Sequence, residues 1–188
     1  MKASLIPNFI TFLRLLLAIP ISISIYQGYD LQGLCLFVVA GLSDGLDGFL
    51  ARKFKWESKF GELLDPLADK CLILSTLIAL AFANKLPIWL VSSLLARDAI
   101  VVMGAMLYMM LFEGGNTLSN RWGKHYTGWT ISLFIIVLLQ NTLITWPNLF
   151  NSLLLIAKMG VLVFTFLSLV SYFNGPGKQI FNQFFDKK

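Results

Sequence analysis

Four aspartates at helical spacing are the side chains in this sequence best suited to chemistry. They form two pairs, Asp44 with Asp47 and Asp65 with Asp69. Residues three or four apart lie on one face of a helix, so each pair presents both carboxylates on the same side. All four lie inside or beside long apolar stretches, where an unpaired charge costs about 3 kcal/mol. We therefore expect a cationic partner at this place.

Divalent metal ions are the cations that fit these acids best. Four carboxylates at one membrane boundary repel one another unless cations neutralise them. Ligand sets made only of oxygen favour hard ions, so we predict two ions, Mg²⁺ or Mn²⁺. Such ions hold phosphate and orient an attacking oxygen. The simpler interpretation, interfacial acids paired with neighbouring lysines, explains one pair but not two pairs at fixed spacing.

Residues next to the acids suit a phosphate-bearing ligand. Arg52 follows the second aspartate closely and is placed to bind further phosphate oxygens. Gly48 and Gly61 would let a ligand approach the backbone of both helices.

Composition places the chain in a membrane. Its 188 residues are 57% hydrophobic and only 13% charged, with a mean hydropathy of +0.74. The formal charge of +5 comes from basic residues at the ends of apolar stretches, which indicates contact with anionic lipid and not with nucleic acid. The two cysteines form no metal-binding motif.

The apolar stretches predict an all-α polytopic membrane protein with a single domain over residues 1–188. We expect six transmembrane helices, over about 8–26, 31–50, 60–83, 86–112, 126–144 and 149–173. The first reads as a retained span and not as a cleavable signal. The sequence Asn-Gly-Pro-Gly at 174–177 should end the sixth helix, leaving a basic, aromatic tail at the interface.

The distribution of basic residues predicts the orientation. Lysine and arginine concentrate at the termini and in the connections after the second and fourth spans, whereas the other connections contain only Lys85. The positive-inside rule then places both termini and the four aspartates on the cytoplasmic side of the inner membrane.

Polar residues elsewhere in the spans are candidate substrate contacts. Asn8, Thr11 and Arg14 recur along one face of the first helix, which should contact protein or a wet cavity. Arg97, in the middle of the fourth span, either binds the phosphate of an acceptor or pairs inside the protein, with Asp98 or Glu62. Lys124 is either an acceptor contact or a headgroup anchor.

The acidic stretch as a whole resembles the signature of CDP-alcohol phosphatidyltransferases, Asp-x-x-Asp-Gly-x-x-Ala-Arg, eight residues, then Gly-x-x-x-Asp-x-x-x-Asp. The matching positions are Asp44, Asp47, Gly48, Ala51, Arg52, Gly61, Asp65 and Asp69. Six spans are also the fold of that family, and residues 7–14 look like its opening helix.

This resemblance implies transfer of the phosphatidyl group of CDP-diacylglycerol to an alcohol, with release of CMP. It further implies that Asp44, Asp47 and Asp65 bind two divalent ions, and that Asp69 completes the metal cluster and deprotonates the acceptor. Gly48, Ala51, Arg52 and Gly61 would lie along the cytidine diphosphate. Family members are commonly homodimers.

Two acceptors stay open. Gly123-Lys124 with Thr127 partly matches the phosphatidylglycerophosphate synthases, which use glycerol 3-phosphate, and this acceptor ranks first by a narrow margin. Ala96-Arg97-Asp98 looks more like the CMP-forming cardiolipin synthases, which use phosphatidylglycerol. The arginine that the glycerophosphate enzymes carry eight residues after Arg97 is Ala105 here.

Three other classes fit less well. Intramembrane prenyltransferases also pair aspartates with magnesium but lack the Ala-Arg at this spacing. A small membrane transporter would distribute its acids across the membrane depth and often contains an internal repeat, which this chain lacks. A purely structural membrane subunit explains none of the spacing.

Overall fold

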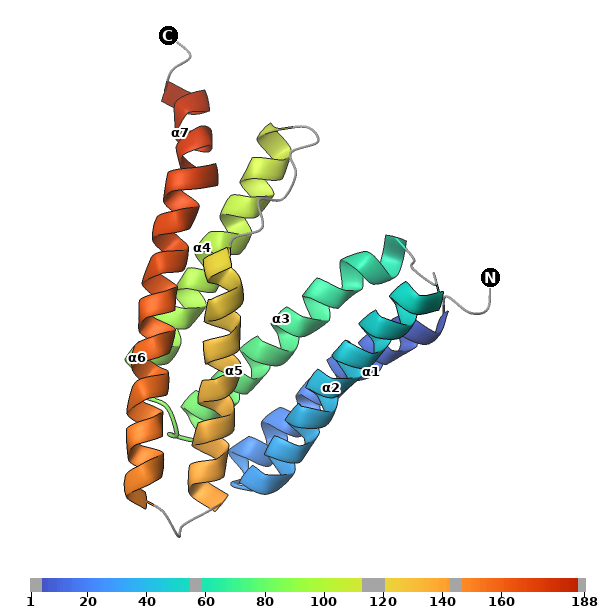
Figure 1. Ribbon diagram of the computed structural model, residues 1–188, viewed down its shortest axis with the longest axis vertical. Coiled ribbons are helices and arrows are strands. Elements are labelled where there is room, and N and C mark those ends of the chain that lie inside the picture. The colour runs from blue at the N-terminus through green and yellow to red at the C-terminus, as the bar shows by residue number, and fades with distance from the viewer. Residues whose placement is uncertain (1–4, 55–58, 113–120, 143–146, 186–188) are drawn as a thin grey trace. The chain divides into compact units, whose positions relative to one another are not determined.

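The computed structural model describes residues 5–54, 59–112, 121–142 and 147–185, without the side chains of 5–10, 46–53, 59–64, 141, 181, 182, 184 and 185. The described residues form an all-α protein with six long helices, followed by a π-helical turn and a short helix (Figure 1). These elements are α1 (Leu5–Tyr26), α2 (Asp30–Phe54), α3 (Lys59–Phe82), α4 (Ile88–Leu111), α5 (Arg121–Thr142), α6 (Pro147–Tyr172), η1 (Phe173–Gly177) and α7 (Lys178–Phe185).

Two of the described turns contain a residue in the left-handed conformation. Gly28, between α1 and α2, has φ of +84°, a conformation that glycine adopts without steric cost. Asn84, between α3 and α4, has φ of +56°, and asparagine is the other residue that tolerates this region. Pro147 opens α6 at a position where its missing amide hydrogen is not needed.

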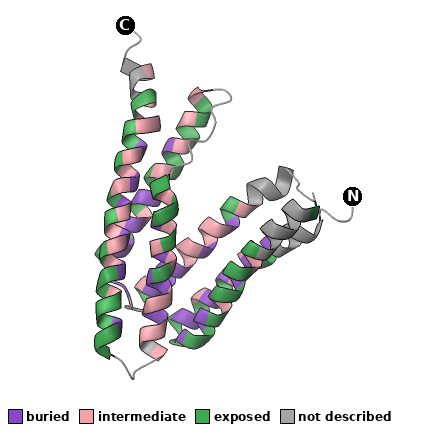
Figure 2. Ribbon diagram, in the orientation of Figure 1, coloured by how far each residue is buried: buried purple, intermediate pink, exposed green. Residues whose placement is uncertain are grey.

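The chain divides into two compact units. The first contains residues 1–87 and 137–145, and the second contains residues 88–136 and 146–188. In the first unit α1 packs against both α2 and α3. Its buried face has a helical spacing, because Thr11, Arg14, Ala18, Ile21 and Ile25 are all at most 6% exposed. Figure 2 marks the buried residues along the helices in purple. The buried face of α1 therefore places Thr11 and Arg14 next to the parts of α2 and α3 that contain Asp44, Asp65 and Asp69.

The other end of this unit contains a second buried charge. Asp30, the first residue of α2, is paired with Lys85, which follows α3. Their side chains are only 9% and 13% exposed. A carboxylate at a helix start and an ammonium just after a helix end also complement the helix dipoles.

In the second unit α4 packs against α6, η1 and α7. The buried stripe of α6 has the helical period, with Ala157, Val161, Thr165, Ser168 and Tyr172 on one face. Gly160 allows the ring of Trp129, from α5, to lie directly against α6.

Two of the helical stretches are long and apolar enough to cross a membrane by the criterion applied to the described residues. These stretches are Ile88–Leu111, with mean hydropathy 1.8, and Pro147–Ile180, with mean hydropathy 2.4. A shorter apolar stretch covers Thr11–Tyr26. The helices confirm the prediction of an all-α chain with six long helices. That all six span the membrane stays a prediction.

The predicted end of the last helix is wrong. The residues Asn174, Gly175, Pro176 and Gly177 do not stop the helix, because the chain continues through η1 into α7. A proline lacks the amide hydrogen that a regular α-helix requires and its ring crowds the preceding turn. The wider π-helical turn accommodates both effects, so the helical path is preserved.

Two boundaries also differ from the prediction. Helix α2 continues to Phe54, which puts Arg52 on a helix and not in the loop expected there. Helix α5 begins at Arg121, ahead of the predicted start at Tyr126, so Lys124 also lies on a helix. The ring of Phe164 stacks on His125 and contacts Trp122 and Trp129, and these contacts stabilise the added first turn of α5.

The contact between Gly160 and Trp129 predicts that Gly160→Ala destabilises the protein. A Cβ atom at this position would lie 2.5 Å from the indole ring, so the ring or the helix must shift, at a cost of about 1–3 kcal/mol. Gly128→Ala is the matched control, because among the described residues no atom beyond its own stretch of helix lies within 4 Å of the added Cβ. Thermal unfolding in detergent should show a lower midpoint only for Gly160→Ala, and equal midpoints would contradict the packing described.

Candidate active site

The candidate site is built on the buried face of α1. Thr11 and Arg14 lie three residues apart on this face, and each is 1% exposed. Their donor groups point toward α2 and α3, where the aspartates predicted from the sequence are found. A hydroxyl and a guanidinium within the packed interior require acceptors, because an unpaired buried polar group is costly.

Arg14 joins an acid from each of the two neighbouring helices. Its Nη1 atom lies 2.6 Å from Oδ1 of Asp44, on α2, and 2.7 Å from Oδ1 of Asp69, on α3. Because one nitrogen makes both contacts, the two carboxylates must lie close to each other. The arginine thus brings one member of each predicted pair to the same point.

Thr11 makes the third connection. Its hydroxyl donates a hydrogen bond of 2.6 Å to Oδ1 of Asp65. Asp65 and Asp69 are four residues apart on α3, so they meet α1 at successive turns, as Thr11 and Arg14 do. Three of the four predicted aspartates are therefore held along one face of α1, and we call Asp44, Asp65 and Asp69 the carboxylate cluster.

The other predicted site residues near the cluster are placed only by their backbone. Asp47, Gly48, Ala51 and Arg52 belong to α2, Gly61 to α3 and Asn8 to α1. Their side-chain positions lie outside the described part of the structure. Their predicted roles as metal ligand, nucleotide contacts and substrate contact therefore stay predictions.

The chemistry of the carboxylate cluster fits a hard divalent ion. Asp44 and Asp69 each direct one oxygen to Arg14, yet their side chains remain 44% and 47% exposed. Carboxylate oxygens that open outward in this way are the ligands that Mg²⁺ prefers. Among the side chains that the structure describes, no three are already arranged as ligands around one ion. The side chain of the fourth acid, Asp47, lies outside the described part of the structure.

Arg97 lies in the second unit within a buried polar cluster of its own. Its Nη1 atom is 2.7 Å from Oδ1 of Asp98, its Nη2 atom donates to the hydroxyl of Ser168, and its guanidinium stacks 4.0 Å from the centroid of the Tyr126 ring. Arg97 and Asp98 are each 4% exposed. Of the two partners that the sequence allowed inside the protein, the structure shows Asp98.

Two members of this cluster were missed by sequence reasoning. Ser168 and Tyr126 come from α6 and α5, and no spacing motif connects them to Arg97. Ser168 could have been predicted to have a polar partner, because it lies on the buried face of an apolar helix and a buried hydroxyl needs a hydrogen bond.

Lys124 is exposed on the first turns of α5. The neighbouring His125 is also exposed and stacks on Phe164, with ring centroids 5.4 Å apart. Lys124 thus has the accessibility that either predicted role requires, as an acceptor contact or a headgroup anchor.

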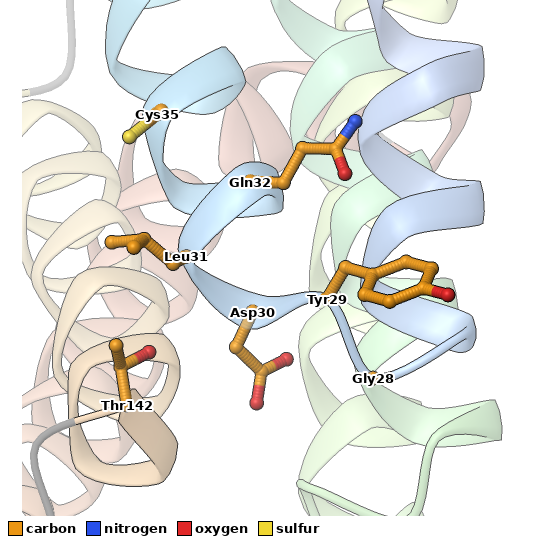
Figure 3. A pocket seen from close by; sticks show the side chains of 7 residues that line it. All are labelled: Gly28, Tyr29, Asp30, Leu31, Gln32, Cys35 and Thr142. Carbon is orange, nitrogen blue, oxygen red and sulfur yellow. The ribbon is translucent and has the colours of Figure 1, made fainter.

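A cavity of about 580 Å³ lies at the opposite end of α1 from the carboxylate cluster. It is lined by Gly28, Tyr29, Asp30, Leu31, Gln32, Cys35 and Thr142 (Figure 3). Helix α1 rises by about 18 Å between Arg14 and its last residue, so the cavity is separate from the cluster. The one carboxylate in its lining, Asp30, is paired with Lys85.

Comparison with known proteins agrees with the acidic signature. Residues 4–170 match the CDP-alcohol phosphatidyltransferase family. The match covers most of the chain, including the carboxylate cluster and the donors on α1. The protein therefore belongs to this family, whose members are membrane-embedded phosphatidyltransferases.

Relatives with assigned names divide between two activities. The chain is 41% identical over 105 residues to a CMP-forming cardiolipin synthase of Streptomyces coelicolor, covering 52% of this chain and 48% of that protein. It is 42% identical over 101 residues to a probable CMP-forming cardiolipin synthase of Drosophila melanogaster, covering 53% and 31%. It is 36% identical over 111 residues to the CDP-diacylglycerol--glycerol-3-phosphate 3-phosphatidyltransferase of Bacillus subtilis, covering 59% and 56%. In each case the match spans less than two thirds of the relative.

The environment of Arg97 predicts a large stability loss for Arg97→Met. This change leaves the Asp98 carboxylate buried without its cation, which costs about 3–5 kcal/mol. Adding Asp98→Asn removes the uncompensated charge and should restore much of the loss. Thermal unfolding in detergent measures both variants, with Arg121→Met, at an exposed position of α5, as the control. If Arg97→Met alone were as stable as Arg121→Met, the ion pair between Arg97 and Asp98 would not contribute to stability.

Proposed function

We propose that the protein transfers the phosphatidyl group of CDP-diacylglycerol to an alcohol acceptor and releases CMP. Membership of the family supports this activity. The observation that carries the proposal is that acids from α2 and α3 meet on one buried face of α1, through Arg14 and Thr11. A cluster of this kind suits the binding of divalent ions and, through them, a pyrophosphate.

In this proposal all four signature aspartates contribute to metal binding. Asp44, Asp47 and Asp65 hold two ions, Mg²⁺ or Mn²⁺, and Asp69 adds to the same cluster. When bound, the ions neutralise the charge that develops on the phosphate oxygens during displacement. Along the nucleotide, the proposed contacts are Gly48, Ala51, Arg52 and Gly61.

Asp69 is the proposed general base. It would accept the proton of the acceptor hydroxyl while the hydroxyl oxygen forms a bond to the phosphorus that carries diacylglycerol. The bond between that phosphorus and the oxygen of CMP breaks at the same time, and CMP leaves. Its half-exposed carboxylate supports this role, because an acceptor can reach it.

We also propose that all six long helices span the inner membrane, with both described ends of the chain and the carboxylate cluster on the cytoplasmic side. The support is the excess of lysine and arginine near the carboxylate-bearing ends of α2 and α3. A homodimer is the assembly that the family resemblance implies, and it stays an expectation.

For the acceptor, we place phosphatidylglycerol first, which would make the product cardiolipin. The sequence alone narrowly favoured glycerol 3-phosphate, but two observations now favour the lipid. The guanidinium of Arg97 is enclosed by Asp98, Ser168 and Tyr126 in place of facing outward for a phosphate, and Ala105 supplies no second cation. Sequence identity does not separate the two acceptors, since the matching cardiolipin synthases share 36–42% identity with the chain and the glycerophosphate enzymes 35–39%.

Glycerol 3-phosphate is the second candidate, with phosphatidylglycerophosphate as its product. The exposed side chain of Lys124 favours it, since a mobile ammonium group can bind the extra phosphate of this acceptor.

The proposal predicts that purified protein with CDP-diacylglycerol and Mg²⁺ releases CMP only when an acceptor is added. With phosphatidylglycerol and glycerol 3-phosphate in competition, mass spectrometry of the lipid products should show mainly cardiolipin. A product that is mainly phosphatidylglycerophosphate would reverse the order of the two acceptors. No CMP with these acceptors, serine or inositol phosphate would reject the enzyme, and solute flux into liposomes without nucleotide would favour a transporter.

Asp69→Asn should reduce kcat by about 10²- to 10⁴-fold, because the amide cannot accept the acceptor's proton. Asp30→Asn is the control, since Asp30 lies in the same unit but at the opposite end of α1. Initial rates of CMP release, normalised to folded protein, measure both. Full activity in Asp69→Asn would remove the proposed base.

A further inference from the structure

The residue that organises the carboxylate cluster is much less accessible than the acids it holds. The side chain of Arg14 is 0% exposed, whereas those of Asp44 and Asp69 are 44% and 47% exposed. The guanidinium therefore lies on the protein side of the two carboxylates, and each acid also faces outward. A ligand that approaches the acids from outside would meet carboxylate oxygens before it reached the arginine.

We propose that Arg14, assisted by Thr11, is a positioning residue that holds the acids of α2 and α3 in a metal-binding arrangement and remains behind them when ions are bound. This inference rests on the proposed function, because it assumes that the cluster binds divalent ions. It differs from the role expected from the sequence, in which Arg14 and Thr11 contact substrate.

Arginine is suited to this role because its charge is permanent. It stays protonated at any pH at which the protein is folded, and its planar group can bind acids from two directions. Without it, Asp44 and Asp69 would repel each other across a short distance and move apart. Hydrogen bonds to ligating carboxylates fix their orientation, and loss of such a partner typically weakens metal binding by about 10- to 100-fold.

Two other roles for Arg14 make opposite predictions. If the arginine only occupied the metal position until an ion displaced it, removal would tighten metal binding, since a competing cation is lost. If it bound the substrate phosphate, removal would raise KM for CDP-diacylglycerol and leave metal affinity unchanged. The complete burial of the side chain argues against both, because neither an ion nor a phosphate can reach it from outside.

The test compares Arg14→Met with Lys85→Met. Both changes remove an enclosed cation from an ion pair in the same unit, but Lys85 pairs with Asp30 and is far from the cluster. Titration with Mn²⁺, followed by electron paramagnetic resonance with and without cytidine diphosphate, gives the Kd of each variant. We expect Arg14→Met to weaken Mn²⁺ binding by about 10- to 100-fold and Lys85→Met to leave it near the wild-type value. Arg14→Lys should recover part of the loss.

A second pair of variants keeps the test decisive if Arg14→Met does not fold. Thr11→Val removes the hydroxyl that donates to Asp65. Thr76→Val is its control on α3, because the Thr76 hydroxyl is buried and has no hydrogen-bond partner among the described residues. Only Thr11→Val should weaken Mn²⁺ binding, by a smaller factor than Arg14→Met.

Unchanged or tighter Mn²⁺ binding in Arg14→Met and Thr11→Val would overturn the inference. Equal weakening by Lys85→Met would do so as well, because the effect would then reflect general destabilisation. Failure of the proposed function is distinguishable, since wild-type protein would then release no CMP with any acceptor. Mn²⁺ binding that responds to Arg14 would still establish the positioning role in that case.

Discussion

The ion pairs from Arg14 to Asp44 and Asp69 are the interaction on which the first unit depends. They connect α1 to α2 and α3 at the point where all three helices carry charge in an otherwise apolar interior. Only Arg14 is fully buried, so loss of both acids would leave its guanidinium without a counter-charge, which is far more costly than the net value of the pair. The same contacts bring together acids that are distant in sequence, so stability of the unit and assembly of the site have one physical origin.

Much of this arrangement could be predicted from the sequence, because helical periodicity determines which residues share a face. The spacing of Asp65 and Asp69, and the three-residue steps through Thr11 and Arg14, place each set correctly. Periodicity does not determine which face of one helix meets which face of another. The direct contacts of Thr11 and Arg14 with the acids were therefore not foreseen, although the sequence does place both on a helix face expected to contact protein or a wet cavity.

Other features depended on information that local sequence does not contain. The partners of Arg97 come from helices far along the chain, and a serine among apolar residues gives no indication of which cation it will meet. The continuation through Phe173–Gly177 was missed for a different reason. Glycine and proline are reliable signs of a break only when the chain has no wider helical turn available, and here η1 provides one.

The pairing of Asp30 with Lys85 has a consequence for the length of α3. Ionic contacts fix the unit near both ends, one at Asp69 and one just beyond the last turn. Each residue added to a helix rotates the next part of the chain by about 100° and moves it by about 1.5 Å. Insertion or deletion of a single residue between Asp69 and Lys85 would therefore break either the contact of Asp69 with Arg14 or the contact of Lys85 with Asp30. Natural variants of this chain should change the exposed residues of that segment more readily than its buried ones, and should keep its residue count.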